Sequence, residues 1–310
     1  MKTRADPTGQ HSNRKRGERA LRVRLNSAQS RILALFRAIP KTRRTKTDIQ
    51  NAAARTVYDY DATSQDLRDI SRSITFILND ELLESQNEMP FDWYWKDRIE
   101  DPYREGTLEE VVIFNQLIAG AVVAGVLVGG FPPRKIEPQE ILLSPQYADN
   151  LNKEWINSFN SIKSLSETTS SQVFTQVNLG IQAGDPPTVI SKSIQKRFDV
   201  SKSSADRIAR TEVNKSYNDS KMALGNIASE RTGLRAGVLH ISALTPTTRK
   251  THADRHGNAY TNDQQLQWWN KGANRINCLC STRSVLIDRQ GKLVDIDLQN
   301  EVKAERKFFE

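Results

Sequence analysis

The segment from Val111 to Phe131, VVIFNQLIAGAVVAGVLVGGF, is the least polar part of the chain. A segment this apolar must leave water, whether for a protein core, an interface between copies or a bilayer. Its length is that of a membrane-spanning helix of about 20 residues, and Gly125 and Gly129 have the spacing used in close helix packing. However, Asn115 and Gln116 interrupt it, and basic residues flank only its C-terminal side. We therefore expect a buried core or oligomer-interface segment rather than a membrane span.

Positive charge is concentrated at the N-terminal end. Residues 1–46 contain fourteen Lys and Arg residues against Asp6 and Glu18, a net charge of +12, so the rest of the chain contributes −4 to the overall +8. Such a concentration of charge attracts polyanions, either nucleic acid or an acidic protein surface. The side chains expected to contact nucleic acid without sequence preference are Arg14, Lys15, Arg16, Arg19, Arg22, Arg24, Lys41, Arg43, Arg44 and Lys46. A solvated tail, or an arm that binds an acidic scaffold protein, stays open as an alternative.

Composition and periodicity divide the chain into three regions. Residues 1–46 are expected to be a basic, partly disordered arm, with the spacing of an amphipathic helix from Ala20 to Ile39. Residues 47–135 are expected to be a helical region that includes the apolar segment. A proline-rich connector follows, and residues 146–310 form a C-terminal region.

Helical and strand patterns both occur in the C-terminal region. The expected helices cover residues 148–165, 170–183, 188–198, 203–232 and 261–269. The expected strands cover residues 236–243, 282–288 and 292–297. The predicted fold class is therefore α+β, with a helical N-terminal region and basic arm followed by a small C-terminal α+β domain.

Three short motifs follow one another in this region: Ala-Arg-Thr-Glu at residues 209–212, Arg249-x-x-His252 with Gly257 behind it, and Asn277-Cys-x-Cys280. Their order and spacing resemble the C-terminal domain of the phage Mu protein F-like head-morphogenesis family. The resemblance covers residues 188–294. The chain departs from the family pattern at Thr247 and Thr248, where an acid is frequent, and at Asn277 and Leu279, where the family often has Pro and Arg.

The resemblance implies a small α+β domain in a structural minor head protein of a tailed bacteriophage, not an enzyme. Such a protein acts in capsid assembly at or near the portal, in the virion and, during assembly, in the host cytoplasm. The implied partners are the portal protein, inner capsid or scaffold proteins and further copies of the chain, but no membrane. The basic arm adds non-specific contact with packaged genomic DNA as an independent expectation. The motif residues expected to form a structural network are Arg210, Thr211, Glu212, Arg249, His252 and Gly257.

Histidines and cysteines near the C-terminus offer candidate metal ligands. His252, His256, Cys278 and Cys280 could supply the two nitrogens and two thiolates of a tetrahedral structural zinc site. Two other interpretations stay open, a hydrogen-bonded polar core and a catalytic site. No cofactor is certain from the sequence.

A hydrolytic site is the alternative to a purely structural role. Glu212 and His252 would be its acid–base pair, with Arg210 and Arg249 as anion stabilisers. A metal-assisted hydrolase or a phage-encoded toxin would carry such a site.

Overall fold

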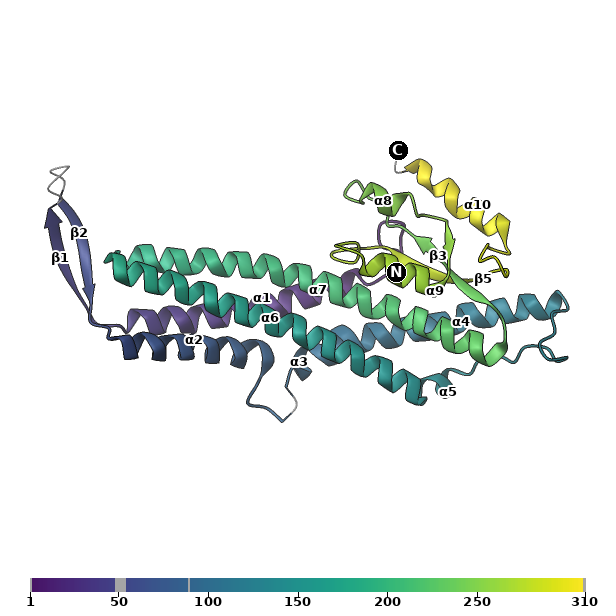
Figure 1. The fold of residues 1–310 in the computed structure, drawn as a ribbon, viewed down its shortest axis with the longest axis horizontal. Helices are drawn as coiled ribbons and strands as arrows, with labels where there is room; N and C mark the ends of the chain where they lie inside the picture. Colours follow the sequence, from purple (N-terminus) through teal and green to yellow (C-terminus); the bar gives the residue numbers. More distant parts are fainter. Residues whose placement is uncertain (1, 48–53, 89, 309–310) are drawn as a thin grey trace. The chain divides into compact units, whose positions relative to one another are not determined.

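The computed structural model describes residues 2–47, 54–88 and 90–308 (Figure 1). The chain forms two compact units, one made of residues 1–17, 93–158 and 209–310 and the other of residues 18–92 and 159–208. This division differs from the predicted boundaries at residues 46, 135 and 146, because three helices contribute residues to both units. These helices are α1 (His11–Arg37), α6 (Pro145–Ala183) and α7 (Pro187–Thr232).

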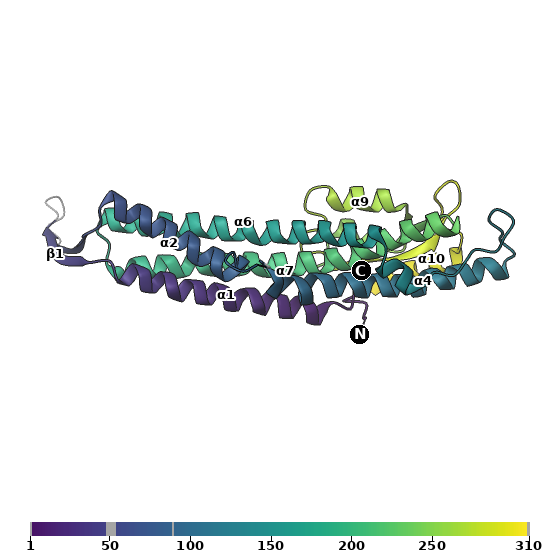
Figure 2. The same cartoon turned by 90° about the horizontal axis from the view of Figure 1, so that it is seen from below.

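The unit of residues 18–92 and 159–208 contains a helical bundle. Parts of α1, α6 and α7 run alongside α2 (Ser64–Leu83) in both views (Figures 1 and 2). Apolar residues three or four positions apart bury one face of α1 and of α2. They include Leu21, Leu25, Ala28 and Ile32 of α1 and Ile70, Ile74, Ile77 and Leu78 of α2.

The basic N-terminal segment is more ordered than predicted, because α1 starts at His11. Its arginines in the bundle pair with acidic residues of neighbouring helices. Arg22 binds Asp206 of α7 through both carboxylate oxygens, and the guanidinium of Arg31 lies 2.7 Å from a carboxylate oxygen of Asp80 in α2. The helix predicted from Ala20 to Ile39 is therefore present, but it begins at His11, so the expected disorder is wrong for residues 11–19.

A β-hairpin follows α1 where a helix was expected to begin. Strands β1 (Lys41–Thr47) and β2 (Ala54–Tyr60) pair antiparallel, with Lys41 opposite Tyr60 and Arg44 opposite Val57. The hairpin is joined to the turn between α6 and α7 by a hydrogen bond from the Tyr58 amide to the Gly184 carbonyl. Helix α2 begins only at Ser64, where Thr63 and Asp66 form a capping box.

In the other unit, helix α4 (Asp101–Val123) contains the first part of the apolar segment. It follows α3 (Asp92–Trp95) and a π-helical turn, η1 (Lys96–Glu100), and together they are long and apolar enough to cross a membrane by length and composition. One face of α4, which includes Val111 and Phe114, packs in a core with Leu224 and Ala228 of α7 and with Ile141 of α5 (Pro138–Leu142). The apolar segment therefore contributes to the core of this unit, and its helix ends before Phe131.

An antiparallel sheet of order β4-β3-β5 completes the unit. Its strands are β3 (Ala236–Ile241), β4 (Ala259–Tyr260) and β5 (Ser281–Leu286). Leu239 and Val285 on one face pack against Leu298 and Val302 near the C-terminus. Val238 on the other face packs with residues of α7 and α9, among them Met222 and Trp269.

Three short helices and a 3-10 turn surround the sheet. They are α8 (Lys250–Ala253), α9 (Asn262–Asn270), α10 (Ile296–Ala304) and η2 (Glu305–Phe308). The strands expected at 236–243 and 282–288 are confirmed to within two residues at each end, as β3 and β5. The strand expected at 292–297 is wrong, because only Leu293 forms a bridge, to Ile287, and α10 begins at Ile296. The fold class α+β is confirmed.

Candidate functional site

Two histidines and a cysteine from three separate elements meet behind the sheet. They are His240 of β3, His252 of α8 and Cys280, which directly precedes β5, and their side-chain ligand atoms all lie within 4.8 Å of one another. Strand alternation explains part of this meeting, because His240 stands opposite Thr282 in the ladder, and Cys280 lies two residues before Thr282, on the same side. Just past the end of the ladder, Cys280 contacts the Ser242 hydroxyl. All three side chains are buried, His240 completely.

Cys278 joins the group through His252. The Nδ1 atom of His252 lies 3.4 Å from the Cys278 sulfur and 3.5 Å from the Cys280 sulfur. The amide of Cys280 donates a hydrogen bond to the sulfur of Cys278 at 3.4 Å. Both sulfurs are thus gathered on one imidazole nitrogen.

The two thiols differ in acidity. The hydrogen bond with Cys278, together with the neighbouring imidazoles of His240 and His252, lowers the pKa of Cys280 against the opposing effect of burial. The same Cys278–Cys280 hydrogen bond and burial raise the pKa of Cys278. Cys280 is therefore the thiol that the surroundings favour as a thiolate.

His256, one of the four predicted metal ligands, has a different role. Its Nδ1 accepts a hydrogen bond from the Ser242 amide at 3.0 Å, and its Nε2 lies 2.8 Å from the Val302 carbonyl. Both ring nitrogens are occupied by backbone groups, so the ring joins β3 to α10 and has no nitrogen left for a metal. Among the described residues, His240 rather than His256 lies with His252 and Cys280.

Arg249 and Gly257 shape the loops on either side of His252. The Arg249 guanidinium donates to the carbonyls of Ala273, Asn274 and Ile276, which precede the cysteines. Gly257 has a φ of 73°, and its amide donates to the His240 carbonyl at 2.9 Å. The Arg-x-x-His-x-x-x-x-Gly motif therefore positions the cysteine loop at one end and β3 at the other.

One face of α7 holds the cysteine loop. Thr211 accepts a hydrogen bond from the Asn277 amide at 2.9 Å, and Asn277 has the positive φ of 53° that asparagine tolerates. Asn214 and Asn218 donate to the carbonyls of Cys278 and Cys280, at 2.7 and 3.1 Å. These three side chains fix the backbone on which both sulfurs are carried.

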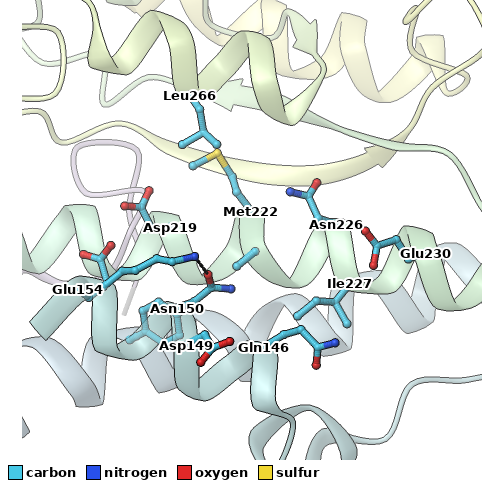
Figure 3. Close-up of a pocket in the computed structure, with 13 residues that line it drawn as sticks. Gln146, Asp149, Asn150, Glu154, Asp219, Met222, Asn226, Ile227, Glu230 and Leu266 are labelled. Carbon is cyan, nitrogen blue, oxygen red and sulfur yellow. Dashed lines mark hydrogen bonds between the residues drawn. The ribbon is translucent and has the colours of Figure 1, made fainter.

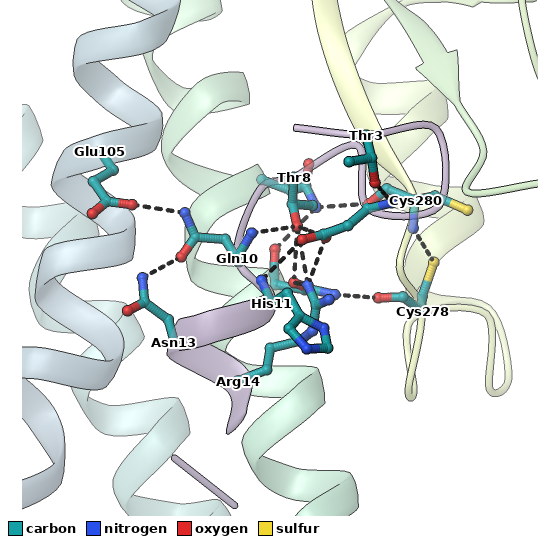
Figure 4. A network of polar contacts seen from close by, with 12 residues as sticks. Thr3, Thr8, Gln10, His11, Asn13, Arg14, Glu105, Cys278 and Cys280 are labelled. Atoms are coloured by element: carbon teal, nitrogen blue, oxygen red, sulfur yellow. Dashed lines mark hydrogen bonds and ion pairs between the residues drawn. The ribbon is translucent and has the colours of Figure 1, made fainter. Parts of the chain in front are cut away.

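The N-terminal segment completes this network, as Figure 4 shows. Arg14 is buried and donates to both Asp6 and Asn214, at 2.9 and 2.8 Å. Thr8 donates to Asp6, and Asp6 also accepts from the His11 amide. The Arg14 side chain thus supports Asn214, the residue that holds Cys278. Arg14 was predicted to contact nucleic acid, but its side chain is buried.

Glu212 lies on another side of α7. It is buried, and its carboxylate accepts a hydrogen bond from Ser158 of α6 at 3.3 Å. Its position is about 100° around the helix from Thr211, on which the cysteine loop rests. This geometry favours a packing role for Glu212 over an acid–base pair with His252. Arg210, the neighbouring motif residue, is half-buried on the same helix.

A second cluster of charged groups lies around a cleft of about 400 Å³ between α6, α7 and α9 (Figure 3). Lys215 contacts the carboxylates of Glu154 and Asp219, at 2.5 and 3.3 Å, and Arg275 also binds Asp219. Burial and the neighbouring Asp219 carboxylate raise the pKa of Glu154 to about 7. Arg275 and Lys215 lower the pKa of Asp219 despite its burial. Nothing in the sequence pattern had indicated this carboxylate pair.

The predicted nucleic-acid contacts separate into engaged and exposed groups. Arg24 donates to Glu84, and Lys41 donates to carbonyls at the end of α1. Arg44 pairs with Asp59 but keeps 70% of its side chain exposed. Lys15, Arg16, Arg19, Arg22 and Arg43 are also exposed, although Arg22 binds Asp206 and Arg16 donates to Asn13. The side chain of Lys46 lies outside the part of the chain that the structure describes.

Comparison with known protein families gives one match. Residues 171–283 match the family described as Phage Mu protein F like protein. The matched residues run from α6 to β5 and include His240, His252 and both cysteines, so the predicted resemblance is confirmed for this region. No curated protein and no solved structure matches the chain.

Proposed function

We propose that this chain is a structural minor head protein of a tailed bacteriophage, because residues 171–283 match the phage Mu protein F-like family, which suggests phage head morphogenesis. It acts in assembly of the head, at or near the portal, and remains associated with the virion. Its partners in this proposal are the portal protein, inner capsid or scaffold proteins and other copies of the chain.

The arrangement of the motif residues supports a structural role. Arg249, Gly257 and Thr211 each bond to backbone groups of the same module, and Glu212 contacts Ser158 within the helices. Hydrogen bonds that hold loops in place are enough to explain why these residues are present, and no reaction with a substrate is needed. This observation, together with the family match, favours the head protein over the metal-assisted hydrolase.

The experiment that tests this proposal removes the gene from the phage or prophage that carries it. We expect missing or malformed heads, recovery by the wild-type gene in trans, and the chain in purified heads by mass spectrometry, together with portal protein in pull-downs. Normal heads that lack the chain would contradict the proposal.

Glu212→Gln separates structure from catalysis: normal particles that are not infectious would indicate an enzyme.

We further propose that the hairpin β1–β2 contacts packaged DNA without sequence preference. Strand β1 has the sequence KTRRTKT, and its described side chains from Thr42 to Thr45 are exposed. A two-stranded antiparallel ribbon has the width to enter a DNA groove, and Lys and Arg side chains neutralise phosphates. The predicted DNA contact thus moves from the whole arm to this hairpin.

A further inference from the structure

The cluster behind the sheet has the atoms of a zinc site. His240, His252, Cys278 and Cys280 supply two imidazoles and two thiols, a donor set that zinc binds with tetrahedral geometry. All four residues are buried, with exposures from 0% for His240 to 7% for Cys278. Such a site in a small module is closed to solvent, as structural zinc sites are.

The distances from His252 to the two sulfurs fit tetrahedral coordination. With Zn–S and Zn–N bonds of about 2.3 and 2.0–2.1 Å, two ligands of a tetrahedron stand about 3.5 Å apart. The His252 Nδ1 atom lies 3.4 and 3.5 Å from the two sulfurs. A hydrogen-bonded thiol can have the same separation, so the remaining atoms of the cluster decide between the two arrangements.

The histidines of the cluster lack the full hydrogen bonding seen at His256. The Nε2 atoms of His240 and His252 are buried without a hydrogen-bond partner. Nδ1 of His240 lies 3.1 Å from the Gln265 side-chain amide, so Nε2 is the nitrogen left for a metal. A buried nitrogen without a partner is costly, and a metal ion would remove that cost at His240.

The residues around the cluster resemble the supporting shell of a metal site. Asn214 and Asn218 fix the cysteine carbonyls, and the Cys280 amide donates to the Cys278 sulfur. The side-chain nitrogen of Gln265 lies 3.1 Å from His240 Nδ1, and its oxygen accepts from Arg255 at 2.9 Å. In the metal-bound tautomer this amide is turned over, so that its oxygen accepts the Nδ1 proton. The Trp268 ring lies 4.7 Å from the His252 ring, measured between centroids, and shields the site from water.

We propose that this chain binds one structural Zn²⁺ through Nε2 of His240, Nδ1 of His252 and the sulfurs of Cys278 and Cys280. The ion joins β3, α8 and the cysteine loop. Its function is to stabilise the module, independently of the assembly role proposed above.

Zinc content tests the proposal directly. The untagged full-length chain, produced with zinc in the medium, is expected to contain about one Zn²⁺ per molecule by elemental (inductively coupled plasma) mass spectrometry. A strong chelator is expected to lower the melting temperature of this chain. Cys280→Ser and His240→Asn should reduce the zinc content at least about tenfold. His11→Ala, which replaces an exposed histidine outside the cluster, should leave it unchanged.

A second measurement covers variants that fail to fold. Cobalt added to the metal-free wild-type chain should give the intense visible bands of a tetrahedral site and near-ultraviolet thiolate bands, which Cys278→Ser weakens. The proposal would be overturned if the wild-type chain, refolded in the presence of zinc, kept less than about a tenth of a zinc ion per molecule. So would a Cys278–Cys280 disulfide in the purified chain, or folded His240→Asn with unchanged zinc.

Discussion

Any side chain at position 257, in place of Gly257, would collide with the backbone of Lys303 in α10. A Cβ atom there would lie 2.9 Å from the Lys303 amide nitrogen and 2.6 Å from its Cγ, and φ is 73°. Gly272 also has a positive φ, 57°, but nothing lies within 4 Å of its Cβ position. We expect Gly272→Ala to cost about 1–2 kcal/mol of unfolding free energy for the backbone conformation alone.

Gly257→Ala should cost at least about 1 kcal/mol more than Gly272→Ala, because the added methyl group overpacks against α10. Urea unfolding of the two variants beside the wild-type chain measures both values. Equal losses would show that contact with Lys303 does not matter and that φ alone requires glycine at position 257.

Single residues also show what sequence could and could not reveal about the site. His252, Cys278 and Cys280 were identified because the motif order names them. His240 was missed, although its strand was predicted correctly. It lies two residues after Val238, so strand alternation places both on the same face, which is also the face of Cys280. His256 was chosen for its four-residue spacing from His252, but Gly257 ends that turn and the ring points to α10. Pairings such as Arg14 with Asn214 depend on a tertiary fold that no local pattern encodes.

At the scale of elements, polar residues inside long helices misled the prediction. Breaks were expected between residues 165 and 170 and between 198 and 203, yet α6 and α7 are continuous. The hydroxyls of Thr169 and Ser201 bond to carbonyls four residues earlier and also lie 2.9 Å from each other, buried between the helices. Because their hydrogen bonds are satisfied locally, these residues need no loop. The strand KTRRTKT was missed because it has no apolar alternation.

The hairpin is the element at which DNA binding can be measured. Arg43→Ala with Arg44→Ala should weaken binding of the full chain to duplex DNA by roughly tenfold and reduce the slope of log K against log salt by about 1–2. Arg68→Ala with Arg72→Ala removes the same charge from the exposed side of α2. Fluorescence anisotropy over a salt series compares the pairs, and equal effects would assign binding to overall charge rather than to the hairpin.

At the scale of the whole molecule, stability should depend on the protonation of Glu154. Its pKa is raised from the ordinary 4.5 to about 7, chiefly by burial, so the folded state favours the protonated acid. The contribution to stability is complete below pH 4.5 and is lost as the pH rises through 7. Its size is roughly 1–3 kcal/mol. The pKa of Asp219 is lowered, so its effect on stability falls in a separate pH range, below the ordinary value of 3.8.

Melting temperatures between pH 4.5 and 8 measure this dependence. We expect the wild-type chain to lose stability over that range and Glu154→Gln, which keeps a neutral side chain, to lose much less. Glu167→Gln on α6 is the control, since its side chain is 62% exposed. A Glu154→Gln curve parallel to the wild-type curve would contradict the assignment.

The bond between Arg14 and Asn214 has a consequence for synthesis on the ribosome. Arg14 and its partner Asp6 are translated together, but Asn214, which also accepts from the buried guanidinium, follows 200 residues later, and the cysteines that this network supports come later still. During elongation the first helix has no native partner there, and its charged end stays hydrated. Closing so long a loop is slow relative to local helix formation. The nascent chain therefore completes this unit late, and the segment around Arg14 reaches its native contacts only after the cysteine loop has been made.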